Sequence, residues 1–104
     1  MEKKSIDKIR RGEAGIERFF GQTVIYLPAS LVERIGEQRV IESSLEFFPR
    51  TADDDYLPRI TGPYELEGTQ YYIFETDSVF EARGREHPKY FVPDKFVRCI
   101  FALP

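Results

Sequence analysis

Short apolar runs, separated by glycine, proline and charged residues, constrain the fold of this chain more than any other feature. The longest run is Val24–Pro28, far shorter than the roughly 20 apolar residues that cross a bilayer. β-Branched and aromatic side chains are common in these runs, which is typical of short strands rather than long helices. We therefore expect a strand-rich fold without a membrane-spanning segment.

Strands are expected where such runs end at turn-forming or charged residues. Gln22–Leu27 is typical of a buried strand, and Phe96–Leu103 carries apolar residues on both alternating faces, as a central strand does. Val40–Phe48 mixes branched, polar and aromatic residues and suits a half-buried strand. Gly68-Thr69 and Gly84–Pro88 indicate two hairpin turns. The strands that flank these turns are predicted at 64–67 with 70–76 and at 79–83 with 89–92.

Helix signals lie in the first third of the chain. Residues 5–20 place several apolar side chains near one helical face, but Gly12 and Gly15 each cost roughly 1 kcal/mol relative to alanine, so a frayed or broken helix is expected. Ser30–Glu33 is a capping-box pattern, in which the serine and glutamate side chains accept hydrogen bonds from each other's backbone amides. Gly36 then offers a stop in the left-handed conformation, which predicts a helix of one or two turns.

These elements together predict the fold class. Residues 49–63 hold three prolines and three consecutive aspartates, and we expect a long loop there. The chain is predicted to be a single α+β domain over residues 1–104. It would have a mostly antiparallel, curved sheet or a partly open barrel of five to six strands, with one or two short N-terminal helices. Strands do not alternate with long helices, which argues against a dinucleotide-binding fold.

Charge is distributed unevenly along the chain. The formal net charge is −3, but residues 1–20, 21–82 and 83–104 carry +2, −8 and +3. An acidic middle disfavours general binding to nucleic acid, which needs clustered basic residues free of nearby carboxylates. A basic partner fits this distribution better than an acidic one.

Cysteine use and the N-terminal residues predict the compartment. Cys99 is the only cysteine, so neither an intramolecular disulfide nor a thiolate zinc cluster is expected. Residues 1–7 are charged and lead into no apolar stretch, unlike a signal peptide. We therefore expect a reducing, cytoplasmic location.

No motif in the sequence dictates a reaction. His87 is the only histidine, and a nucleophilic pair with Cys99 is disfavoured because Cys99 falls on the more apolar face of its predicted strand, where thiols are usually inert. Asp53-Asp54-Asp55 lacks the alternate ligand spacing of a calcium loop, and the scattered glycines form no phosphate-binding loop. We predict no metal and no cofactor, and a binding protein in preference to an enzyme.

Tyrosines and carboxylates gather in the middle of the chain, beside two arginines. Tyrosine and arginine are enriched at the centres of protein interfaces. A partner-binding surface is therefore predicted within residues 49–72. Its candidate residues are Arg50, Asp53, Asp54, Asp55, Tyr56, Arg59, Tyr64 and Tyr72.

The leading hypothesis is a non-enzymatic protein-protein interaction module that binds a protein partner, preferably a basic one, through this acidic, tyrosine-containing surface. Two alternatives stay open. One is a small-ligand-binding domain or minor enzyme with a pocket on the concave sheet face near His87. The other is a structural subunit that pairs strand edges in a homo-oligomer.

Overall fold

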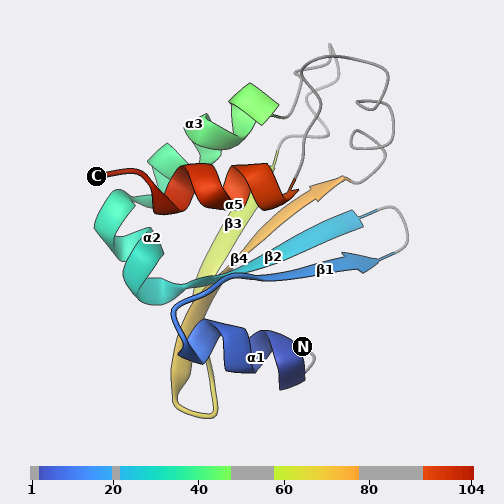
Figure 1. The fold of residues 1–104 in the computed structure, drawn as a ribbon, viewed down its shortest axis with the longest axis vertical. Helices are drawn as coiled ribbons and strands as arrows, with labels where there is room; N and C mark the ends of the chain where they lie inside the picture. The colour runs from blue at the N-terminus through green and yellow to red at the C-terminus, as the bar shows by residue number, and fades with distance from the viewer. Residues whose placement is uncertain (1–2, 20–21, 48–57, 78–92) are drawn as a thin grey trace.

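The computed structural model describes residues 3–19, 22–47, 58–77 and 93–104 (Figure 1). These ranges hold four helices and four strands: α1 (Lys3–Arg10), β1 (Gly15–Phe19), β2 (Gln22–Pro28), α2 (Ala29–Ile35), α3 (Glu37–Phe47), β3 (Arg59–Leu66), β4 (Thr69–Asp77) and α5 (Pro93–Phe101). The predicted α+β class is confirmed. The element counts differ from the five to six strands and the one or two N-terminal helices that were expected.

The four strands form one open antiparallel sheet in the order β1-β2-β4-β3. β2 and β4 are central, and β2 pairs with β4 along its whole length, from Gln22 opposite Asp77 to Pro28 opposite Tyr71. β1 and β3 are therefore the two edge strands of the sheet in the described part of the chain.

Helices cover the two faces of the sheet unequally (Figure 1). α2, α3 and α5 pack on one face, where Ile25, Phe74 and Phe96 are completely buried. Only α1, among the described helices, packs on the other face, where Ile9 contacts Val24 and Tyr26. Neighbouring residues of β2 serve opposite faces because successive side chains of a strand point to opposite sides.

The N-terminal segment is a helix followed by a strand, not a helix over residues 5–20. α1 ends in a glycine cap: Gly12 has φ of +77° and donates its amide to the carbonyl of Ile9 at 2.9 Å. The amide of Glu13 donates to the carbonyl of Lys8 at 2.8 Å, so the two bonds complete a Schellman motif. The chain then turns directly into β1.

The predicted strand Gln22–Leu27 is confirmed as β2, but the prediction of a capping box after it is wrong. α2 begins at Ala29 with Pro28 in the cap position and no side-chain cap hydrogen bond. Ser30 thus lies inside the first turn, because the strand passes into the helix without an intervening loop. Gly36 ends this seven-residue helix with φ of +92°, although its ψ of 141° lies outside the left-handed helical region.

Two predicted strands are helices. Val40–Phe48 lies mostly in α3, where Val40 and Ser44 are fully buried one turn apart and the Ser44 hydroxyl donates to the carbonyl of Ile41 at 2.6 Å. Phe96–Leu103 lies mostly in α5, whose Phe96 and Ile100 face the core. In both segments, tertiary packing selects the helical period over the alternating one.

The hairpin around Gly68 is confirmed, with its turn one residue earlier than predicted. Leu66 pairs with Thr69, and the loop residues Glu67 and Gly68 both have positive φ, at +51° and +80°. Positive φ at both positions is the signature of a type I′ turn. The expected loop over 49–63 is also corrected, because Arg59 to Pro63 belongs to β3. The predicted second hairpin, at 79–92, lies outside the described residues.

Candidate functional site

The sheet face beside α1 carries a surface that we call the tyrosine face, formed by Tyr26, Tyr64, Leu66, Tyr71 and Ile73. Strand register places these side chains together: Tyr64 pairs with Tyr71, and Ile73 pairs with Tyr26. Leu66 lies two residues after Tyr64 and so points to the same side. The surface thus crosses three strands, from central β2 through β4 to edge β3.

The three tyrosines form a ladder that becomes more exposed towards the sheet edge. Tyr26 and Tyr71 meet edge to face, with ring centroids 5.9 Å apart, and Tyr71 and Tyr64 are 5.8 Å apart. Tyr26 is buried, Tyr71 is half-buried, and Tyr64 is 44% exposed. Contacts of this geometry are worth about 0.5–1.5 kcal/mol beyond area burial, so the exposed ring is held by the inner ones.

β3 is exposed along nearly its whole length. Seven of its eight residues are exposed and only Ile60 is half-buried. Its pairing with β4 shifts register between Thr61 and Tyr64, where the chain passes through Gly62 and Pro63. Proline has no backbone amide hydrogen, and a bulged edge strand resists continuous pairing with another strand. The side chains of β3, rather than its backbone edge, are therefore the part of the strand suited to contact another molecule.

A partly buried carboxylate fixes the inner end of the ladder. Glu17 of β1 accepts hydrogen bonds from the Tyr26 hydroxyl at 2.8 Å and from the Ser5 hydroxyl of α1 at 3.0 Å. Burial raises the pKa of Tyr26 above its ordinary value, and the hydrogen bond to Glu17 raises it further because ionisation would abolish that bond. The phenol is thus held neutral, and it links β1 to β2 while Ser5 ties α1 to the same carboxylate.

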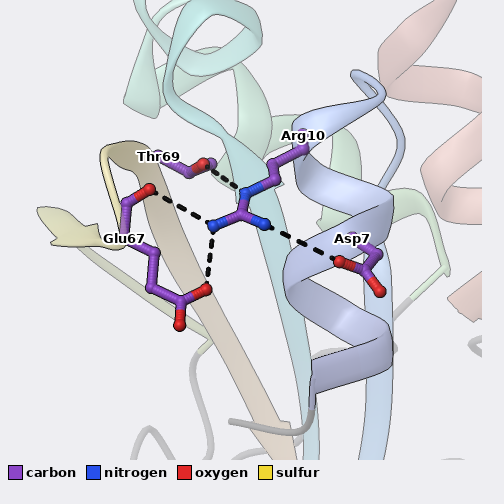
Figure 2. A network of polar contacts seen from close by, with 4 residues as sticks. All are labelled: Asp7, Arg10, Glu67 and Thr69. Carbon is purple, nitrogen blue, oxygen red and sulfur yellow. Dashed lines mark hydrogen bonds and ion pairs between the residues drawn. The ribbon is translucent and has the colours of Figure 1, made fainter.

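An arginine clasp joins α1 to the hairpin turn (Figure 2). One guanidinium nitrogen of Arg10 lies 2.8 Å from the Glu67 carboxylate and also donates to the Glu67 carbonyl at 3.3 Å. Its Nε donates to the Thr69 hydroxyl at 3.3 Å, and Asp7 lies 3.9 Å away. The clasp fixes the tip of the hairpin that carries Tyr64 and Leu66.

The structure brings part of the predicted surface together. Arg59 and Tyr64 lie on the same side of β3, with Arg59 opposite Glu75 and Tyr64 opposite Tyr71. Tyr72 is buried on the helix-covered face, where burial and the nearby charges of Glu33 and Glu37 raise its pKa. The other candidates lie outside the described residues: Arg50, Asp53, Asp54, Asp55 and Tyr56.

Four members of the tyrosine face were not among the sequence candidates: Tyr26, Leu66, Tyr71 and Ile73. Tyr26 lies within a run that predicts a buried strand, so nothing marked it as part of a surface. Leu66 and Tyr71 flank the predicted hairpin turn symmetrically. Pairing outward from a two-residue loop at Glu67-Gly68 would have placed Tyr64 opposite Tyr71 from the sequence alone.

No group of three or more histidine, cysteine, aspartate or glutamate side chains among the described residues is arranged to hold a metal ion. Cys99, expected in a core strand, is a half-buried free thiol on α5, and His87 lies outside the described residues. Every helix in the described ranges is too short or too polar to cross a membrane.

Comparison of the chain with protein-family models, with curated proteins and with solved structures found no match.

Proposed function

We propose that this chain is a non-enzymatic protein-binding module that binds its partner through the tyrosine face. One observation carries the proposal: Tyr64 and Leu66 are 44% and 37% exposed and lie on the same side of an edge strand, next to the half-buried Tyr71. Large apolar side chains are usually covered when they cluster, and tyrosine is among the residues that contribute most to protein interfaces.

The ladder favours binding because it is ordered before the partner arrives. Tyr71 packs between Tyr26 and Tyr64, and the Tyr64 hydroxyl lies 3.4 Å from the Thr61 hydroxyl. Ordering a rotamer-rich side chain on association costs about 0.5–1.5 kcal/mol. A tyrosine already held by its neighbours avoids much of that cost, so its contact area contributes more fully to affinity.

Charge on the hairpin favours a basic partner. Residues 58–77 contain one basic residue, Arg59, and four acidic ones: Glu65, Glu67, Glu75 and Asp77. Glu67 forms an ion pair with Arg10, and Glu75 lies directly opposite Arg59 on the neighbouring strand. Exposed Glu65 has neither contact, and it points to the other side of β3 from Tyr64 and Leu66. A partner surface with apolar side chains for the tyrosine face and basic ones at its rim complements this hairpin.

The test begins with covalent capture from the tyrosine face. A photo-crosslinking amino acid replaces Tyr64 in one sample and Phe19 in a matched one, because Phe19 is 55% exposed on the other edge strand. We expect a protein to crosslink at position 64 and not at position 19. That protein is then purified for binding measurements.

Affinity for the captured partner decides the proposal. The double variant Y64T/L66T, which keeps a strand-forming residue at each position, should weaken binding by about 2 kcal/mol or more, whereas F19T should leave it unchanged. Equal affinity of Y64T/L66T and the unchanged chain would end the proposal. Crosslinking of position 64 to a second copy of this chain would instead favour the homo-oligomer alternative, which light scattering measures directly.

A further inference from the structure

A groove of about 450 Å³ lies between α5 and the connection from α1 to β1, away from the tyrosine face. One wall is a single stripe of α5, formed by Asp94, Val97, Arg98 and Phe101. These residues follow the i, i+3, i+4, i+7 spacing of one helical face. Phe96 and Ile100 face the core instead, so α5 divides its sides between the core and the groove.

The opposite wall is held in place by the cap of α1. The hydrogen bonds from Gly12 to Ile9 and from Glu13 to Lys8 fix the turn that carries Ala14 into β1. Ala14 and Ile16 are half-buried and pack against the main core cluster, as do Val97 and Phe101 from α5. The groove therefore has an apolar floor built from two ordered elements.

Its rim carries two cations without an ion pair to a described residue. Of the four charged residues at the groove, Glu13 is paired with Arg11 at 2.7 Å. Asp94 lies in the first turn of α5, where a negative charge is favoured by the helix dipole. Lys8 and Arg98 come from opposite walls, and neither lies within salt-bridge distance of a carboxylate in the described ranges.

The two cations at the rim come from the two basic segments of the sequence. Lys8 belongs to the basic segment 1–20 and Arg98 to the basic segment 83–104, which carry +2 and +3 and are separated by the acidic middle of the chain. Folding brings one cation from each segment to the same groove. A ligand with a single negative charge would complement Lys8, Arg98 and Asp94 together, leaving the rim neutral.

We propose that this groove binds a small amphipathic carboxylate, with its carboxylate between Lys8 and Arg98 and its apolar body on Ala14, Ile16, Val97 and Phe101. A volume of about 450 Å³ falls in the range of small-molecule sites, and a mostly apolar lining with a few charged groups is typical of them. Arginine provides a planar donor pair that matches a carboxylate.

The proposal is tested by titrating the full-length, ¹⁵N-labelled chain with 4-phenylbutyrate and with its neutral amide, followed by backbone NMR shifts. We expect shifts at Gly12, Ala14, Val97 and Arg98 with the carboxylate and much weaker ones with the amide. R98Q and K8Q, both at the rim, should each weaken phenylbutyrate binding by about tenfold. K95Q is the matched control, because Lys95 is exposed on the same helix and does not line the groove.

Three outcomes would overturn the carboxylate site: the amide binding as tightly as the acid, K95Q weakening binding as much as R98Q, or shifts that avoid the groove. Shifts at Tyr64 and Leu66 instead would place phenylbutyrate on the tyrosine face. The first three outcomes do not bear on the proposed protein-binding function, because the groove and the tyrosine face share no residue.

Discussion

The two faces of the sheet are stabilised in different ways. The face under α2, α3 and α5 buries Ile25, Leu27, Phe74, Phe96 and Ile100 completely. Among the described residues, the α1 face buries the smaller apolar cluster of Ile9, Val24 and Tyr26 and leaves Tyr71 and Ile73 half-exposed. There, α1 is also held by hydrogen bonds and an ion pair, through Ser5 and Arg10.

Under the proposed function, this difference separates the face that stabilises the fold from the face that would bind a partner. Apolar burial contributes roughly 25 cal/mol per Å² and needs no particular geometry, so the helix-covered face supplies most of the free energy of folding. Polar contacts such as those of Ser5 and Arg10 contribute less but are directional. They fix one helix over part of a sheet face while the rest of that face stays exposed, and it is there that we propose a partner binds.

The largest effect is expected on the helix-covered face. Phe96 is completely buried, and its ring centroid lies 4.9 Å from that of Phe74 and 6.1 Å from that of Phe47. Phe96→Ala should lower the free energy of unfolding by about 3–5 kcal/mol, as truncation of a buried aromatic residue does. Urea denaturation measures the loss. Tyr71→Ala, on the half-buried ladder, is the matched variant and should cost clearly less; equal losses would contradict the division between the faces.

A smaller effect is expected where α1 packs on β1. A Cβ at Gly15 would lie 2.9 Å from the Cβ of Ser5 and 3.2 Å from its Cα, so the helix backbone would have to move. Gly15→Ala should destabilise the chain by about 1–3 kcal/mol, which is typical of overpacking. Hydrogen exchange should rise in α1 and stay unchanged in α5. Faster exchange in both helices would mean that the two faces are not independent.

Sequence predicted the fold class, the central strand β2 and the hairpin around Gly68, and the reason it failed for other segments is visible in α5. The run from Phe96 to Leu103 satisfies both an alternating and a helical pattern, so periodicity alone could not choose. The start signal lay outside the run: Pro93 at the first helical position and Asp94 in the first turn are typical of a helix N-terminus. In the fold, the ring of Phe96 packs against Phe74 and Phe47, which stabilises the helix. These contacts join residues far apart in the sequence, so no local pattern could predict them.

The sequence predicted that tyrosines form the candidate surface, but it did not predict which face of the sheet each tyrosine lies on. Tyr64 and Tyr72 were both candidates, yet they lie on opposite faces of the sheet. Which face a tyrosine takes depends on strand register, and a shift of one residue reverses it. The register shift between Thr61 and Tyr64 is such a change, and it depends on the pairing of β3 with β4.

The two tyrosines that are buried among the described residues offer a comparison of the faces by pH. Tyr26 and Tyr72 both have a raised pKa, mainly through burial. Above the ordinary tyrosine pKa of about 10, the unfolded chain releases phenol protons that the folded chain retains, so the free energy of unfolding falls as pH rises. Tyr26→Phe and Tyr72→Phe should each make this alkaline loss less steep.

At neutral pH the two variants should differ. Tyr26→Phe loses the hydrogen bond to Glu17 and should cost about 1 kcal/mol, while the Tyr72 hydroxyl has no such bond to a described residue and Tyr72→Phe should cost less. Urea denaturation at pH 7 and at several values above pH 10 measures both effects. If the curves of Tyr26→Phe and the unchanged chain fall in parallel above pH 10, the Tyr26 phenol is not held neutral by the fold.

The smallest effect is expected at the clasp in Figure 2. Arg10→Gln removes the ion pair to Glu67, but Arg10 and Glu67 are 43% and 64% exposed, so the loss in unfolding free energy should stay below about 1 kcal/mol. Arg11→Gln is the matched control, since Arg11 makes an ion pair of similar exposure with Glu13, two residues along the chain, and this pair does not reach the hairpin. Hydrogen exchange at Gly68 and Thr69 should therefore increase in Arg10→Gln and not in Arg11→Gln. Because the clasp fixes the strand that carries Tyr64, Arg10→Gln should also weaken partner binding through a less ordered tyrosine face; unchanged exchange at the turn would show that the ladder alone orders it.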